Sequence, residues 1–223
     1  MTPRGEKTTV ALLLAAVVPP AFFWCAAVSG TRPLPPPPWL ATPLDRALPV
    51  VPASSWLYVS WYAAPLALLW LRVSSFRRAA MALGLGFGVC ALGYLAFPVT
   101  IGRPYVSGTG LSAMLLRALY SVDPPCNIFP SFHATVATIL AASLDARAPI
   151  RRAVVGWMAA ICVACVLTKQ HYVLDVVAGV IVGGASLAVA DALGAAVSWA
   201  LCVGTLAAPG HAPPGHAPRA EGR

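Results

Sequence analysis

The stretch TKQHYVLDVVAG, residues 168–179, places a lysine, a histidine and an aspartate at the start of an otherwise apolar segment. His171 and Asp175 are four residues apart, so on a helix their side chains share one face. The carboxylate can then accept a hydrogen bond from one ring nitrogen, which fixes the tautomer and leaves the other nitrogen basic. A histidine held in this way suits a general base or a nucleophile. Because this spacing is common by chance, the surrounding chain decides what the pair does.

The composition of the chain is that of a membrane protein. Of the 223 residues, 59% are apolar and 10% are charged, whereas a soluble domain has about 25% charged residues. A membrane-spanning helix needs about 20 apolar residues, and uncharged stretches that reach this length lie at 8–31, 47–71, 79–102 and 124–144. Two further spans are expected at 153–168 and 171–190. We therefore predict an all-α integral membrane six-helix bundle that occupies residues 1–207.

The positions of the charged residues predict the orientation of this bundle. A net charge of +8 would suggest a nucleic-acid partner in a soluble protein. Here ten of the Lys and Arg residues fall in segments on the side of the N-terminus and five on the other side, the asymmetry typical of cytoplasmic loops. We expect a multi-pass protein of the cell (inner) membrane with both termini cytoplasmic and residues 168–179 on the outer, periplasmic side. The expected partner is the lipid bilayer, and no nucleic-acid partner is expected.

The connecting segments carry weaker signals. Residues 32–43 are proline-rich and predict an extended loop along the outer interface. In the loop between the third and fourth spans, residues 110–123 have apolar side chains at helical spacing, which predicts a short helix; Asp123 at its end is expected to be a solvated or membrane-surface charge. Residues 192–206 could form an interfacial helix, which we favour, or a seventh span.

The two ends of the chain and its cysteines leave further expectations. The first span could be a cleaved signal peptide, but its length favours a retained helix. Residues 208–223 repeat PGHAP and predict a disordered Pro/Gly/His tail. Five of the six cysteines lie in apolar spans, where a thiol packs as a small hydrophobe.

Three short polar pieces fall on the predicted outer side: GRP at 102–104, FPSFH at 129–133 and TKQHYVLD at 168–175. Charged groups at membrane depth are costly and are rarely present without a task. Ser131 marks a helix start, where first-turn N–H groups can bind an anion, and His133 lies within that turn. Arg103 and Lys169 add positive charge. Two histidines, a carboxylate, two cations and a helix N-terminus together suit phosphoryl transfer.

The same three pieces resemble the type 2 phosphatidic acid phosphatase superfamily, whose pattern is KxxxxxxRP, PSGH and SRxxxxxHxxxD. The residues FPSFH and TKQHYVLD are most similar to those of the branch that includes inositol phosphorylceramide synthases. The resemblance covers residues 98–184, which we take as the motif core.

The resemblance implies a role for each matching residue. His171 would attack phosphorus to give a phosphohistidine, and Asp175 would orient it. His133 would protonate the leaving alcohol and later activate the acceptor. The phosphate oxygens would be held by Arg103, Ser131 and first-turn amides near Phe132. The resemblance implies no metal and no cofactor.

The chain departs from the pattern at three positions. The lysine of the first motif falls at Ala96, and the serine and arginine of the third fall at Ala164 and Cys165. Lys169 lies one turn after Cys165 and could supply the lost charge. Because lysine gives a point charge where arginine gives a two-pronged clamp, the phosphate pocket should differ in shape from that of the general family.

These observations predict an integral membrane enzyme that acts on a membrane lipid. Hydrolysis of a lipid phosphate or diphosphate is the first expectation, and transfer of a phospho-headgroup such as inositol phosphate is the second. A metal site of His133, His171 and Asp175 is a further possibility, as is an inactive scaffold or a transporter. A transporter should carry ionisable groups near mid-membrane, whereas here they gather at one face. The sequence leaves the lipid and the oligomeric state open.

Overall fold

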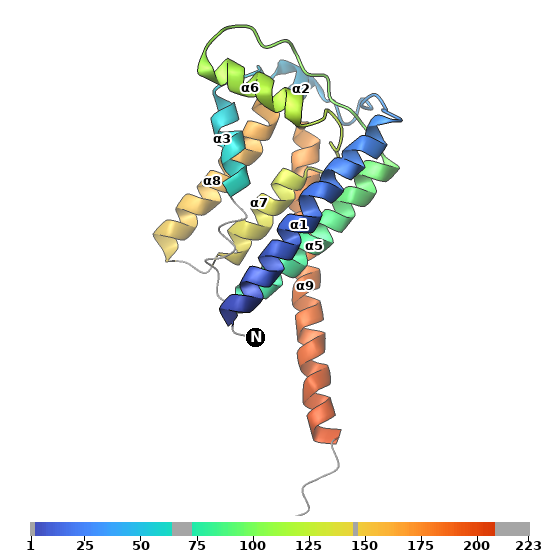
Figure 1. Cartoon of the computed structure of the whole chain (residues 1–223), viewed down its shortest axis with the longest axis vertical. Helices are drawn as coiled ribbons and strands as arrows, with labels where there is room; N and C mark the ends of the chain where they lie inside the picture. Colours follow the sequence, from blue (N-terminus) through green and yellow to red (C-terminus); the bar gives the residue numbers. More distant parts are fainter. Residues whose placement is uncertain (1–2, 64–72, 145–146, 208–223) are drawn as a thin grey trace, which may run out of the picture.

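The computed structural model describes residues 3–63, 73–144 and 147–207. In these ranges the secondary structure is helical, with eight α-helices, one 3₁₀ turn and a single isolated bridge between Leu34 and Val99. The all-α prediction is therefore confirmed (Figure 1). The elements are α1 (Pro3–Gly30), α2 (Pro43–Ala47), α3 (Ser54–Ser60), η1 (Trp61–Ala63), α5 (Val73–Ala96), α6 (Leu111–Val122), α7 (Phe132–Ser143), α8 (Ala148–Leu167) and α9 (Val173–Ala207).

Four of the described helices, α1, α5, α8 and α9, are long and apolar enough to cross a membrane. They correspond to the first, third, fifth and sixth predicted spans and fit a membrane protein. α5 ends at Ala96 rather than at residue 102, because Pro98 disfavours helical geometry in the residue before it. α1 runs as one helix through Pro19 and Pro20.

The six-helix bundle as predicted is not confirmed, because the second span differs. Residues 47–71 do not form one helix over their described part: α2 ends at Ala47, and α3 begins only at Ser54. Pro49 and Pro52 separate the two helices, since each proline lacks an N–H donor and restricts the residue before it. Residues 64–71 of this predicted span lie outside the described residues.

The fourth predicted span is also shorter than expected. α7 has 12 residues and begins at Phe132, whereas the uncharged stretch begins at residue 124. Pro124, Pro125 and Pro130 occupy the missing part and favour turn and extended geometry over helix. The consequence is a loop, 124–131, in which Cys126, Asn127 and Ile128 are buried.

The short helix between the third and fourth spans is confirmed as α6, which lies across one end of the bundle (Figure 1). Its buried residues are Ala113, Leu116 and Leu119. Leu111 and Met114, two of the residues that predicted the helix, are 73% and 52% exposed. The apolar face is therefore wider than the contact with the protein, as suits a helix at a membrane surface.

Residues 192–206 form neither a separate interfacial helix nor a seventh span, because α9 continues unbroken through them to Ala207. The helix has 35 residues, and its second half extends away from the other helices (Figure 1). The predicted tail at 208–223 lies outside the described residues.

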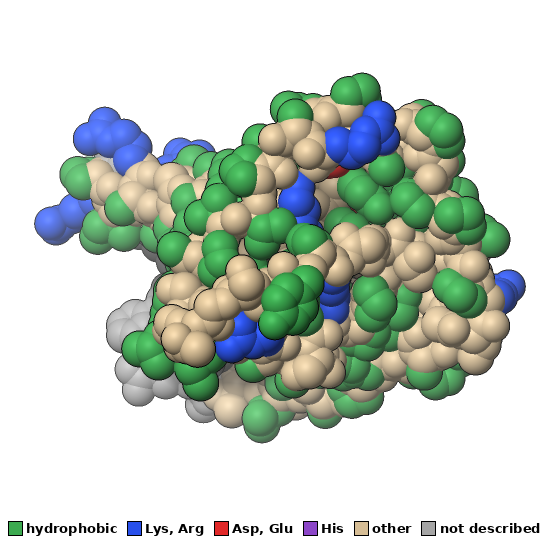
Figure 2. Space-filling view, turned by 90° about the horizontal axis from the view of Figure 1, so that it is seen from above, with side chains coloured by type: hydrophobic (Ala, Val, Ile, Leu, Met, Phe, Trp, Pro, Cys, Tyr) green, Lys and Arg blue, Asp and Glu red, His purple; other side chains and the backbone are tan. Residues whose placement is uncertain are grey.

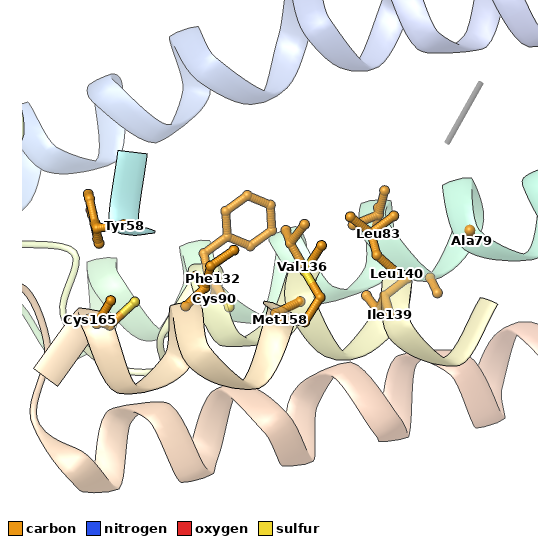
Figure 3. Packing of buried hydrophobic residues seen from close by; sticks show 14 of the residues in the cluster. Tyr58, Ala79, Leu83, Cys90, Phe132, Val136, Ile139, Leu140, Met158 and Cys165 are labelled. Carbon is orange, nitrogen blue, oxygen red and sulfur yellow. The ribbon is translucent and has the colours of Figure 1, made fainter. Parts of the chain in front are cut away.

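α7 is the centre of the packing. Nine of its twelve residues are buried, and it lies against α5, α8 and α9. Phe132, Val136, Ile139 and Leu140 pack with side chains of the neighbouring helices (Figure 3). The five cysteines that the structure describes are free thiols, and Cys25, Cys90, Cys162 and Cys165 lie within or beside this packing.

Two glycines set the distance between α7 and α9. A Cβ at Gly179 would lie 2.3 Å from the carbonyl oxygen of Ser131, and one at Gly183 would lie 2.8 Å from that of Thr135. The Thr135 hydroxyl donates to the Gly179 carbonyl at 3.0 Å. Small residues allow this close approach of backbones, which holds the start of α9 against the start of α7.

Candidate active site

The two motif histidines meet at the end of the bundle that carries α2 and α6. His133 lies in the first turn of α7 and His171 lies just before α9. His133 Nδ1 is 3.2 Å from His171 Nε2, and each side chain is 5% exposed. The structure therefore brings together two imidazoles that are 38 residues apart in the chain.

The other ring nitrogen of His171 fixes its tautomer. His171 Nδ1 lies 3.0 Å from the carbonyl oxygen of Ile128 and 3.4 Å from Asp175 Oδ2. Because a carbonyl oxygen only accepts, Nδ1 must carry the proton. Nε2 of the neutral ring is then left with a lone pair directed toward His133. Asp175 lies beside His171 as predicted, although His171 precedes α9 and the two residues do not share one helix as their spacing suggested. The contact with Ile128 is made by its backbone, which no residue pattern encodes.

Asp175 and Ser131 connect the helices that carry the histidines. Asp175 Oδ2 accepts from the backbone N–H of Tyr172 at 2.8 Å, and the Asp175 carbonyl accepts from Ser131 N–H at 3.0 Å. Ser131 is the N-cap of α7, as expected, and its hydroxyl accepts from Ala134 N–H. The Phe132 side chain packs against Phe87 in the core, so only its backbone is available to a ligand.

Arg103 reaches the same end but binds protein acceptors. Its guanidinium donates to the carbonyls of Tyr120, Asp123 and Pro124 and to the side-chain oxygen of Gln170. It also lies 4.8 Å from the centre of the Tyr120 ring. Arg103 Nε has no hydrogen-bond partner. Arg103 therefore fixes the segment between α6 and α7.

Lys169 and Asp45 each bind the backbone of the other's segment, and we call this pair of contacts the Lys169–Asp45 clamp. Lys169 Nζ donates to the carbonyls of Asp45 and Leu48 at 2.7 and 2.8 Å, at the C-terminal end of α2. The Asp45 carboxylate accepts from Val173 N–H at 2.8 Å, at the first residue of α9. Asp45 also forms a capping box with Thr42, a pairing whose T-x-x-D signature is visible in the sequence. The start of α9 and helix α2 are thus held together by two charged side chains.

The expectation that Asp123 is a solvated or membrane-surface charge is wrong. Asp123 is 8% exposed, and its carboxylate accepts a hydrogen bond from the Tyr58 hydroxyl at 2.9 Å. Burial raises the pKa of this carboxyl, while the Tyr58 hydroxyl and the charge of Arg103 act in the opposite direction. The expectation failed because Asp123 ends α6, and the sequence does not show that α3 covers that end.

His171 lies between two cavities. One is a pocket of about 630 Å³ whose lining includes Arg46, Lys169, His171 and Tyr172. The other is a small cavity of about 10 Å³, which His171 and His133 line together with Asp123 and Gln170. Figure 2 views the end face above these cavities and shows Lys and Arg side chains at several places among apolar ones. Sequence reasoning missed Arg46 and Gln170 as site residues, and neither belongs to a recognisable spacing.

The predicted residues therefore divide into two groups. His133, His171, Asp175 and Ser131 come together in one network, whereas Arg103 and Lys169 bind carbonyls at its margin. Among the described residues, no group of three or more His, Cys, Asp or Glu is arranged to hold a metal ion. The arrangement offers a basic ring nitrogen, a second imidazole within reach and cations beside the pocket.

Comparison with protein families agrees with this geometry. The PAP2 superfamily matches the chain over residues 34–189, a range that runs from the loop after α1 to the middle of α9 and contains every residue of the site. Comparisons with curated proteins and with solved structures found no match. Because the match covers more than half of the chain and all three motif pieces, this membrane protein belongs to the PAP2 superfamily.

Proposed function

We propose that this protein is an integral membrane lipid phosphatase that hydrolyses a lipid phosphate or diphosphate through a phosphohistidine on His171. Membership of the superfamily indicates phosphatase or phosphotransferase chemistry. The observation that carries the proposal is the position of His171 Nε2, 3.2 Å from His133 Nδ1, while Nδ1 is held by the Ile128 carbonyl. A nitrogen with a lone pair beside a second imidazole is a nucleophile with its own acid catalyst.

In the first half-reaction, His171 Nε2 attacks phosphorus. The new N–P bond forms as the P–O bond to the lipid breaks, and His133 gives its proton to the leaving oxygen. Asp175, 3.4 Å from Nδ1, stabilises the positive charge that develops on the His171 ring, as the carboxylate of a catalytic triad does. The substrate phosphate must enter between the two rings, which are in contact in this structure.

We assign phosphate binding to the donors that remain around the rings. Lysine has three N–H donors, and Lys169 uses two of them on Asp45 and Leu48. Arg103 keeps one N–H without a partner. These donors, with Ser131 and the first-turn amides near Phe132 at the positive end of α7, neutralise the phosphate oxygens by charge and hydrogen bonding. The scheme therefore runs on protein groups alone.

The larger pocket supports a lipid headgroup as the substrate. Its lining combines the cations Arg46 and Lys169 with apolar side chains such as Leu48 and Val50, which suits a phosphate joined to a hydrocarbon chain. α1 begins and α9 ends at the end of the bundle opposite to the site (Figure 1). With the charge asymmetry of the sequence, this supports cytoplasmic termini and an active site at the outer leaflet of the cell membrane.

The test is a phosphate-release assay on purified protein in detergent, with a chelator present, against a panel of lipid phosphates and diphosphates. His171→Ala should lower the rate by at least about 10³-fold. His211→Ala, in the C-terminal tail, is the matched control and should keep wild-type activity. If the wild type and His171→Ala are alike across the panel, the catalytic proposal fails and the inactive scaffold takes its place.

Transfer of a phospho-headgroup is the second candidate function, and the volume of the larger pocket favours it. About 630 Å³ is enough for a headgroup-sized alcohol beside His171, as a member of the inositol phosphorylceramide synthase-like branch would require. Adding inositol to the same assay separates the two candidates. A new phospholipid that appears only with inositol would identify a transferase, whereas free phosphate alone identifies a hydrolase.

A further inference from the structure

The small cavity beside the two histidines has the size of a single water molecule. Its volume is about 10 Å³, close to the smallest space that holds one water. Besides His133 and His171, its lining includes the polar side chains of Asp123, Asn127 and Gln170. All five of these side chains are at least nine-tenths buried.

Two of the lining side chains have buried atoms without a hydrogen-bond partner. Gln170 uses its oxygen to accept from Arg103, and its Nε2 has no partner. Asn127 uses its Nδ2 to donate to the carbonyl of Phe22 at 2.7 Å, and its Oδ1 has no partner. One amide therefore offers a free donor and the other a free acceptor. Buried polar atoms in this state are expensive, and one water can accept from the first and donate to the second.

Asp123 adds a charged acceptor to the same space. Its Oδ2 accepts from Tyr58, which comes from another helix and fixes the orientation of the carboxylate. Asp123 has no role in the phosphoryl transfer proposed above, although Asp123 lines the same cavity as the rings of His133 and His171. A carboxylate, an amide donor and an amide acceptor form the kind of site that orients a water through several directed hydrogen bonds.

We infer that this cavity binds the water that hydrolyses the phosphohistidine, and that Asp123, Asn127 and Gln170 orient it. The inference rests on the proposed function and names the acceptor of the phosphoryl group. The water oxygen forms a bond to phosphorus, the P–N bond to His171 Nε2 breaks, and His133 takes the proton of the water. Inorganic phosphate leaves, and both rings return to their starting state. The cavity has no room for an alcohol of headgroup size, so the acceptor that it binds is water.

The test follows the phosphoenzyme with a ³²P-labelled lipid phosphate. Asp123→Asn keeps the size of the side chain and removes its charge, and it should slow breakdown of the phosphohistidine by about 10–100-fold. Labelled protein should therefore accumulate, with a lower kcat and no rise in KM. Gln170→Glu keeps the oxygen that binds Arg103 and replaces the donor with an acceptor, so it should slow the same step. It also serves as the second variant if Asp123→Asn does not fold.

Asp191→Asn is the matched control, because it makes the same chemical change at an accessible carboxylate that pairs with Arg78 at the other end of the bundle. It should break down the phosphohistidine at about the wild-type rate, since an exposed ion pair contributes little. If Asp191→Asn slows the step as much as Asp123→Asn does, the effect does not come from the cavity and the inference is overturned. Wild-type breakdown in Asp123→Asn and Gln170→Glu overturns it as well.

Failure of the proposed function gives a different result. If the wild type forms no labelled histidine, or if His171→Ala still forms it, the phosphohistidine scheme itself is wrong. If wild-type label forms on His171 and decays equally fast in all variants, the scheme stands and only the water site is rejected.

Discussion

The two ends of the bundle use charged residues in opposite ways. At the end that carries the chain termini, Arg77 pairs with Glu6 and Arg78 pairs with Asp191. These pairs join side chain to side chain and are accessible, with Arg77 66% and Asp191 55% exposed. At the other end, Arg103 and Lys169 donate mainly to backbone carbonyls of other segments.

The difference identifies which charged side chains fix the positions of other segments and which contribute little to stability. An exposed ion pair gains little, because water and salt screen it and the two side chains lose freedom. Arg103 and Lys169 are half-buried and have less access to water, so they rely on their protein acceptors and fix the positions of these acceptors. The accessible pairs tie α1 to α5 and α5 to α9, whereas the half-buried donors Arg103 and Lys169 bind the loops around the histidines. This contrast predicts that activity depends on charges at one end only.

The largest effect is expected for Asp175→Asn, which should lower kcat by about 10²–10⁴-fold. The amide keeps the shape of the side chain but cannot stabilise the positive charge that develops on the His171 ring. The measurement is kcat and KM for phosphate release in detergent. Asp191→Asn makes the same chemical change in the same helix at the other end and should leave both constants unchanged. Equal losses in the two variants would remove the distinction between the ends.

The second effect is a steric clash at the contact between α7 and α9. Gly179→Ala should destabilise the protein by about 1–3 kcal/mol, because its Cβ would lie 2.3 Å from the Ser131 carbonyl oxygen. Gly184→Ala is the control in the same helix, where a Cβ meets no atom within 4 Å. The unfolding temperature in detergent measures both. If Gly179→Ala unfolds at the wild-type temperature, contacts other than this glycine set the distance between the starts of α7 and α9.

Much of this arrangement could be predicted from the sequence. The His171–Asp175 spacing and the Ser131 N-cap depend on local geometry, and the structure has both. The predicted spans failed where prolines interrupt apolar stretches, at Pro49 and Pro124. Hydropathy alone does not register such interruptions, because proline ends a helix through its missing donor and fixed φ rather than through polarity.

The partners of the cations could not be predicted, because they are backbone carbonyls. Arg103 binds the end of α6 and Lys169 binds the end of α2, and every residue has a carbonyl, so no sequence pattern marks these acceptors. The burial of Asp123 depends on Tyr58, 65 residues earlier in the chain. Of the contacts made by Lys169 and Asp45, only the capping box of Thr42 and Asp45 can be recognised in the local sequence.

The smallest effect tests the comparison most directly, by removing one cation at each end. Lys169→Met loses two hydrogen bonds to α2 and should cost about 1 kcal/mol of stability, with a higher KM for the lipid because the clamp beside the pocket loosens. Arg78→Met loses the accessible pair with Asp191 and should leave activity within about twofold of wild type. Raising the salt concentration should weaken the Arg78 contribution further, since exposed pairs are screened. A loss of activity in Arg78→Met as large as in Lys169→Met would show that α5 and α9 transmit strain from the end with the chain termini to His171, and the end at which a charge lies would then no longer separate functional from structural charges.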